Sequence, residues 1–144
     1  MTKSKRIITE IIIHCTATEY CMPVTQKDLF KWHVVERGFK DIGYHFVIDQ
    51  SGCIIICRPL GVPGAHCKDH NRHSIGICYV GGLKDGFPTD TRSICQKETM
   101  HKLIKDLCNS FPITKITGHN EYSNKSCPCF DAKKEYSHLI KSLL

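Results

Sequence analysis

The chain has 144 residues, of which 41% are hydrophobic, and a formal net charge of +6. This length and composition suit one domain with a full hydrophobic core, and no run of about 18 apolar residues is present that could span a membrane. The basic residues are scattered instead of following one helix face, which does not indicate a specific nucleic-acid site. The positive charge favours negatively charged polymers in general, including a bacterial wall.

The N-terminal residues 1–13 are basic and then apolar. Their apolar run is about six residues long and lacks a small-residue cleavage site, so we expect a strand and not a signal peptide. We therefore expect synthesis in the cytoplasm, with the ten cysteines mostly reduced. Cys53, Cys57 and Cys78 fall in predicted strands and are expected to be small buried residues. The lack of a Cys-x-x-Cys pair argues against a zinc ribbon or a thioredoxin-type motif.

The predicted elements alternate between strands and helices along the chain. The first half predicts a strand over residues 7–13, a helix that begins at a capping box of Thr25 and Asp28 and ends at Gly38, and a hairpin of strands 43–49 and 53–57. The second half predicts a loop over 58–73, a strand over 74–80, a loop over 81–91, a helix over 96–108, a strand over 115–118 and a helix over 132–143. This order predicts a single α/β domain over residues 1–144, with a mixed central β-sheet flanked by helices.

Two predicted strands end in a histidine, His14 and His119, and Cys127 lies near the C-terminus immediately before Pro128. Proline fixes its own φ and favours an extended conformation at the preceding residue, which holds the Cys127 thiol in a defined direction. We expect His14, His119 and Cys127 to meet on one zinc ion, because catalytic zinc takes three protein ligands and leaves one position for water. Two neutral imidazoles and one thiolate leave a net positive charge of about one, which lowers the pKa of the bound water to about 7.

A rival metal cluster is present in the loop over 58–73. His66, His70 and His73 have a spacing that suits a metal, yet this loop has no rigid element to fix their geometry. The usual glutamate base of zinc proteases has no His-Glu-x-x-His motif here. Glu121 follows His119 by two positions and is the one stand-in for it, although we expect a solvent-exposed side chain at that position.

Several motifs, in order and spacing, resemble a known family over nearly the whole chain. They are Ile13-His14-Cys15-Thr16-Ala17-Thr18, Trp32-His33, Arg37-Gly38-Phe39, Ile42-Gly43-Tyr44-His45-Phe46-Val47-Ile48, Gly64-Ala65-His66, Asn71-Arg72-His73-Ser74-Ile75-Gly76-Ile77, Gly118-His119 and Lys125-Ser126-Cys127-Pro128-Cys129-Phe130-Asp131. The family is the zinc-dependent N-acetylmuramoyl-L-alanine amidases of the phage-lysozyme type, relatives of the peptidoglycan recognition proteins. The resemblance implies one Zn²⁺ per chain, held by the residues that match its ligands: His14, His119 and Cys127.

The same resemblance assigns roles to further residues. It implies that Tyr44 orients the attacking water or relays its proton, and that Lys125 stabilises the oxyanion of the tetrahedral intermediate. His66, Asn71 and His73 are expected to line the groove that holds the sugar and peptide. The plainer alternatives are a core tyrosine for Tyr44 and a solvated loop charge for Lys125.

The implied activity is hydrolysis of the bond between N-acetylmuramic acid and L-alanine in peptidoglycan, by a monomer that reaches the wall after cell lysis, through a phage holin or by assisted export. One alternative is a module that binds peptidoglycan without cutting it, although members of that kind typically lack the cysteine ligand. A second alternative is a protein-partner role, because phage-lysozyme relatives can also bind a phage RNA polymerase. We expect peptidoglycan as the partner, with no specific nucleic acid and no transmembrane segment.

Overall fold

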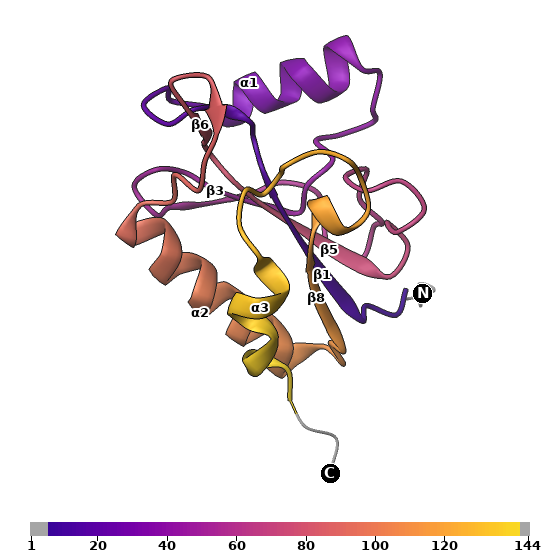
Figure 1. The fold of residues 1–144 in the computed structure, drawn as a ribbon. Coiled ribbons are helices and arrows are strands. Elements are labelled where there is room, and N and C mark those ends of the chain that lie inside the picture. The colour runs from indigo at the N-terminus through magenta and orange to yellow at the C-terminus, as the bar shows by residue number, and fades with distance from the viewer. Residues whose placement is uncertain (1–5, 142–144) are drawn as a thin grey trace.

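The computed structural model describes residues 6–141, so the ends of the chain at 1–5 and 142–144 lie outside the description (Figure 1). Its main sheet has five strands in the order β4-β3-β5-β1-β8. The strands are β1 (Glu10–Cys15), β3 (Phe46–Ile48), β4 (Ile54–Ile56), β5 (Ser74–Tyr79) and β8 (Lys115–Gly118). The edge strand β4 pairs antiparallel with β3, and the other three pairings are parallel. The predicted mixed sheet is therefore confirmed.

Strand β1 lies between β5 and β8, and all six of its residues are buried. A strand covered on both faces needs a nearly continuous apolar run, which Ile11, Ile12 and Ile13 provide. The predicted start at residue 7 is three residues too early. Pairing begins where the N–H groups of Thr9 and Glu10 both donate to the carbonyl of His73, and Ile7 lies beyond that point with 68% of its surface exposed.

The helices pack on the two faces of this sheet (Figure 1). Helices α2 (Ile94–Ser110) and α3 (Ala132–Tyr136) cover one face, where Met100, Leu103 and Ile104 pack with the odd-numbered side chains of β1. Helix α1 (Gln26–Phe30) covers the other face, where its Leu29 packs with residues of β3 and β5. His14 is even-numbered, and the alternation of a strand places it on the α1 side.

The helix ends follow their local chemistry. The capping box predicted at the start of α1 is present, because Thr25 Oγ1 accepts from the N–H of Asp28 at 3.2 Å and the Asp28 carboxylate accepts from the N–H of Thr25 at 2.9 Å. Helix α1 continues as a π-helical stretch, η1 (Lys31–Glu36), and the chain then turns at Gly38 with φ +77°.

The second long helix begins earlier than predicted, and the last helix is shorter. Helix α2 starts at Ile94 because Ser93 and Gln96 form a capping box. Helix α3 gives way to the 3₁₀ turn η3 (Ser137–Leu139), after which Ile140 is extended. The last part of the predicted helix over 132–143 lies outside the described residues.

A second sheet was not predicted. Short strands β6 (Gly82–Lys84) and β7 (Phe87–Pro88) pair with each other in the region expected to be a loop over 81–91, and β2 (Thr18–Glu19) pairs with β6. These strands have two or three residues each, which is too short for a periodic hydrophobic pattern. Gly82, with φ +105°, lies so close to Cys15 that a Cβ there would stand 2.5 Å from the cysteine sulfur.

All ten cysteines are free thiols in this structure. Cys78 is buried as expected, whereas Cys53 is exposed at the hairpin turn, so its predicted burial is wrong. The turn 50–53 contacts the start of α2, where the hydroxyls of Ser93 and Thr99 donate to the carbonyls of Gln50 and Gly52, but the Cys53 side chain stays exposed. None of the helices described here is both long enough and apolar enough to cross a bilayer.

Candidate metal centre

His14 and His119 lie side by side because β1 and β8 run parallel. Ile13 of β1 is opposite Gly118 of β8, so the next residue of each strand is a histidine at the same edge of the sheet. The two imidazole centroids are 4.6 Å apart. His119 begins the 3₁₀ turn η2 (His119–Glu121), where the carboxylate of Glu121 accepts from the N–H of Gly118 at 3.0 Å. Glu121 is exposed, as expected.

Cys127 reaches the two histidines from the loop that precedes α3. Its Sγ lies 3.9 Å from Nδ1 of His14 and accepts from the N–H of Cys15 at 3.2 Å. The loop is held at the next residue, where the hydroxyl of Tyr79 donates to the carbonyl of Pro128 at 2.6 Å. One ligand atom from each of His14, His119 and Cys127 lies within 4.8 Å of the other two, and residues 6–141 contain no other group of this kind.

This donor set fits zinc. Zinc bonds of about 2.0–2.3 Å place tetrahedral ligand atoms about 3–4 Å apart, so the three side chains need to move inward by only about 1 Å. Metal-binding imidazoles must be unprotonated. Burial, followed by the nearby His66 and His119, holds the pKa of His14 well below its usual value. Burial and then the charge of Lys125 lower the pKa of His119.

Tyr44 lies against the metal group on the α1 side of the sheet. Its ring centroid is 5.2 Å from those of both His14 and His33. Burial, with smaller contributions from Cys78 and Cys127, raises the pKa of Tyr44 well above its usual value. The phenol is therefore neutral near pH 7 and can donate a hydrogen bond beside the metal group.

Lys125 is exposed on the same loop as Cys127. Its charge is close enough to His119 to lower the pKa of that imidazole. The ammonium group forms no ion pair with any described residue. A cation without a partner therefore stands next to the metal group.

The three predicted substrate-binding residues are not gathered in one place. His66 lies within the site, with its Nδ1 at 2.8 Å from Nε2 of His14. The side-chain carbonyl of Asn71 accepts from the N–H groups of His66 and Cys67, which braces the loop. His73 is exposed and precedes β5 directly, at the strand end opposite to His14. Contact of these residues with substrate stays a prediction.

The rival histidine cluster does not form. His66 contacts His14, whereas His70 stacks on the ring of Tyr122 with centroids 3.7 Å apart, and His73 is exposed. Within residues 6–141 these three side chains are not a metal-binding group.

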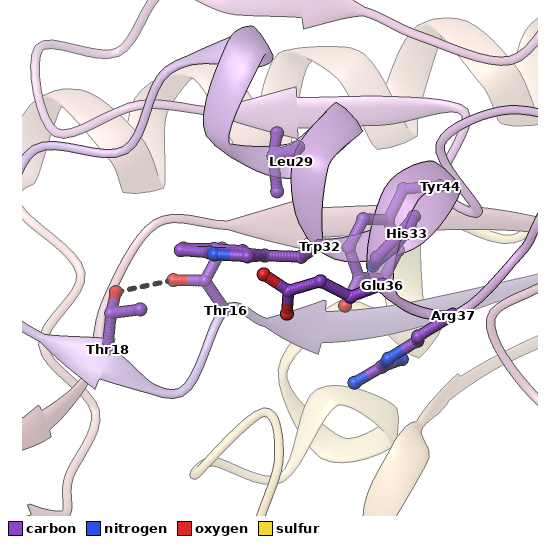
Figure 2. Close-up of a pocket in the computed structure, with 8 residues that line it drawn as sticks. All are labelled: Thr16, Thr18, Leu29, Trp32, His33, Glu36, Arg37 and Tyr44. Carbon is purple, nitrogen blue, oxygen red and sulfur yellow. Dashed lines mark hydrogen bonds between the residues drawn. The ribbon is translucent and has the colours of Figure 1, made fainter.

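A cavity of about 310 Å³ is lined in part by Tyr44, whose ring lies 5.2 Å from that of His14 between centroids (Figure 2). Its lining residues are Thr16, Thr18, Leu29, Trp32, His33, Glu36, Arg37 and Tyr44. Figure 2 shows the indole of Trp32 flat across the cavity, with the Glu36 carboxylate in front of it. Thr16 and Thr18 join their hydroxyls at 2.7 Å. Thr16 and Trp32 stand in the sequence motifs without a predicted role, because their common cavity depends on how η1 lies over the segment that follows β1.

Comparisons with known proteins identify the family and the fold. The family model for N-acetylmuramoyl-L-alanine amidase matches residues 4–130. The endolysin of Escherichia phage T7 is 32% identical over 143 residues, which cover 97% of this chain and 94% of that protein. Peptidoglycan-recognition protein LB of Drosophila melanogaster is 31% identical over 82% of this chain and 53% of its own. The solved N-acetylmuramoyl-L-alanine amidase LysC of Clostridium intestinale superposes with a TM-score of 0.76 at 25% identity, covering 89% of this chain and 80% of that one. The chain therefore belongs to the N-acetylmuramoyl-L-alanine amidase family.

Proposed function

We propose that His14, His119 and Cys127 hold one zinc ion per chain and that this centre hydrolyses the amide bond between N-acetylmuramic acid and L-alanine in peptidoglycan. The observation that carries the proposal is the convergence of two imidazoles and one thiol from three distant segments, with ligand atoms within 4.8 Å of one another. Membership of the amidase family supports the reaction. A zinc ion at this position would supply Lewis-acid activation of water and of the amide carbonyl.

Tyr44 and Lys125 act on different atoms of the reaction in this proposal. The neutral phenol of Tyr44, 5.2 Å from His14 between ring centroids, orients the attacking water or carries its proton. The ammonium of Lys125 stabilises the oxyanion that develops on the carbonyl oxygen. Both groups touch the reacting atoms, so both are catalytic residues and neither is a metal ligand.

The cavity beside Tyr44 is the place for substrate. Its mixed lining of one indole, three hydroxyls and two charged side chains suits a sugar or a short peptide with polar ends. Substrate contacts from His66, Asn71 and His73 remain part of the proposal. The cell wall is accordingly the proposed site of action, and the net charge of +6 favours approach to a negatively charged wall.

A module that binds peptidoglycan without cutting it is the second candidate, since some of the relatives are named as recognition proteins. The thiol of Cys127 beside two histidines favours the hydrolase, because binding alone has no need of a third metal ligand.

The test compares Cys127→Ser with the parent protein for zinc content by mass spectrometry and for release of stem peptide from purified peptidoglycan. We expect one zinc per parent chain, and loss of both zinc and activity in the variant. Cys53→Ser, at the exposed hairpin turn, is the matched control and should retain both. Stoichiometric zinc in Cys127→Ser would show the ligand assignment to be wrong, and a parent that binds peptidoglycan without releasing peptide would favour the binding module.

A further inference from the structure

A chain of hydrogen bonds leads away from the metal group on the side of His14 that faces away from Cys127. Nε2 of His14 lies 2.8 Å from Nδ1 of His66. Nε2 of His66 lies 3.2 Å from the hydroxyl of Ser74. The Ser74 hydroxyl lies 2.7 Å from the carbonyl oxygen of His70, which is the last member of this hydrogen-bond series.

The carbonyl of His70, at the end of this hydrogen-bond series, sets the donor and acceptor of every hydrogen bond in the series. A carbonyl can only accept, so the single hydroxyl hydrogen of Ser74 points to His70. The Ser74 oxygen is then an acceptor for Nε2–H of His66, and Nδ1 of His66 has a free lone pair. That lone pair accepts from Nε2–H of His14. The remaining nitrogen, Nδ1 of His14, is therefore unprotonated and faces Cys127 Sγ at 3.9 Å.

The backbone holds the His66 ring in this place. A Cβ added to Gly76 would lie 2.6–2.9 Å from three atoms of the ring, and one added to Gly64 would lie 2.6 Å from ring atom Cδ2. The His66 ring therefore occupies space that a side chain at Gly64 or Gly76 would fill. The Asn71 side chain fixes the loop by accepting from the N–H of His66 at 2.9 Å.

We propose that His66 and Ser74 are positioning residues of the metal centre, which hold His14 as an Nδ1 ligand by fixing its Nε2–H. This inference rests on the zinc assignment proposed above and adds a positioning role for His66 to the substrate contact proposed there. Groups that bond the second nitrogen of a metal-binding histidine orient its ring and increase its basicity. Their loss typically lowers metal affinity by about 10- to 100-fold.

The test measures zinc affinity of the metal-free full chain by competition with a chromophoric chelator, so its readout is independent of activity. We expect His66→Leu to bind zinc roughly 10- to 100-fold more weakly. His66→Asn should recover most of this loss, because its amide oxygen can take the position of the Nδ1 acceptor. Ser74→Ala should give a smaller decrease, and His101→Leu, a histidine exposed on α2, should match the parent.

A second measurement does not depend on whether these variants fold. Nitrogen-15 NMR of the zinc-loaded parent should show His14 protonated at Nε2 and free of a proton at Nδ1. A folded His66→Leu with parental zinc affinity, or a parent in which His14 carries its proton on Nδ1, would overturn the proposal and leave the amidase function standing. A parent that binds no zinc would overturn the metal assignment as well.

Discussion

Two groups of polar side chains in this molecule are assembled from distant segments, and they differ in whether a cation of the chain itself lies among the acceptors. Buried Arg92 donates to both carboxylate oxygens of Asp90 and of Glu135 and to the hydroxyl of Tyr136, with its guanidinium carbon 3.4 Å from the centroid of the Phe130 ring. The metal group has only lone pairs at its centre: two imidazoles and one thiol. The Arg92 cluster contains its own cation, which stabilises the fold, whereas the metal group has three potential metal ligands and no cation of the chain among them, which suits an external metal ion.

The largest expected effect comes from removing the cation of the Arg92 cluster. Arg92→Met keeps a long apolar side chain and leaves Asp90 and Glu135 without their cation. The free energy of unfolding should fall by about 3 kcal/mol, the lower end for a broken buried pair, because the two carboxylates are 29% and 40% exposed. Urea denaturation measures this change. Lys102→Met, which breaks the exposed pair with Asp106, is the control and should cost less than about 0.5 kcal/mol. Equal losses in both variants would remove the distinction between closed and exposed charges.

The next largest effect concerns catalysis at the metal group and leaves the proposed zinc ligands unchanged. Tyr44→Phe deletes one hydroxyl, and Lys125→Ala deletes one exposed charge. Each should reduce turnover by roughly 10²-fold, or about 2.7 kcal/mol of transition-state stabilisation, with zinc content and unfolding free energy unchanged. Peptidoglycan hydrolysis rates measure this effect. Tyr20→Phe and Lys105→Ala, both at exposed positions, serve as controls. A Lys125→Ala variant with full turnover would identify Lys125 as an ordinary solvated charge.

Acid should lower the free energy of unfolding through buried His45, whose two ring nitrogens are both hydrogen-bonded. Nδ1 of this buried histidine accepts from the N–H of Gly76 at 3.0 Å, and its Nε2–H donates to the carbonyl of Val62 at 2.8 Å. Burial lowers the pKa of His45 to about 4. The unfolded chain, with a histidine pKa near 6.5, takes up the proton first, so stability is complete above that pH and is lost between about 6.5 and 4.

From pH 7.5 to 5.5 this histidine should remove about 1.3 kcal/mol of unfolding free energy, measured on the metal-free protein. His45→Gln should remove that part of the pH dependence, whereas exposed His101→Gln should not. An unchanged pH dependence in His45→Gln would show that protonation of His45 does not contribute.

The smallest effect compares the loss of one partner in each cluster. Asp90→Asn leaves Arg92 bonded to both oxygens of Glu135, so it should cost only about 1 kcal/mol in urea denaturation. The metal group has no second thiolate that could replace Cys127, and Cys127→Ser is expected to lose its zinc. A cost for Asp90→Asn as large as that of Arg92→Met would show that the three charges act as one unit.

Local patterns predicted the elements that depend on neighbouring residues. The capping box at Thr25 and strand β8 were found where expected. The antiparallel hairpin of β3 and β4 was also found, with shorter strands than predicted. Each of these depends on hydrogen bonds or alternation within a few positions, which a sequence displays directly.

Features that depend on distant contacts could not be predicted. Strands β2 and β6 pair Thr18 with Gly82, and no periodic signal exists in strands of two or three residues. The π-helical stretch of η1 has the same spacing of apolar residues as an ordinary helix. The place of His66 beside His14 depends on the open slot at Gly76, in a strand that pairs with β1. The motif of the loop indicated a role for His66, but only the fold showed which atom it faces.

The central position of β1 has a consequence for synthesis on the ribosome. This strand is translated before its partners, which are residues 74–79 and 115–118, and Cys127 follows later still. Because the cost of closing such long loops must be met before the pairings form, folding should be slower than in proteins built from local contacts. A nascent or truncated chain that ends before Cys127 has both histidines but no complete centre. Hydrolysis at the proposed metal centre should therefore require synthesis through Cys127, so fragments that end before this residue should be inactive.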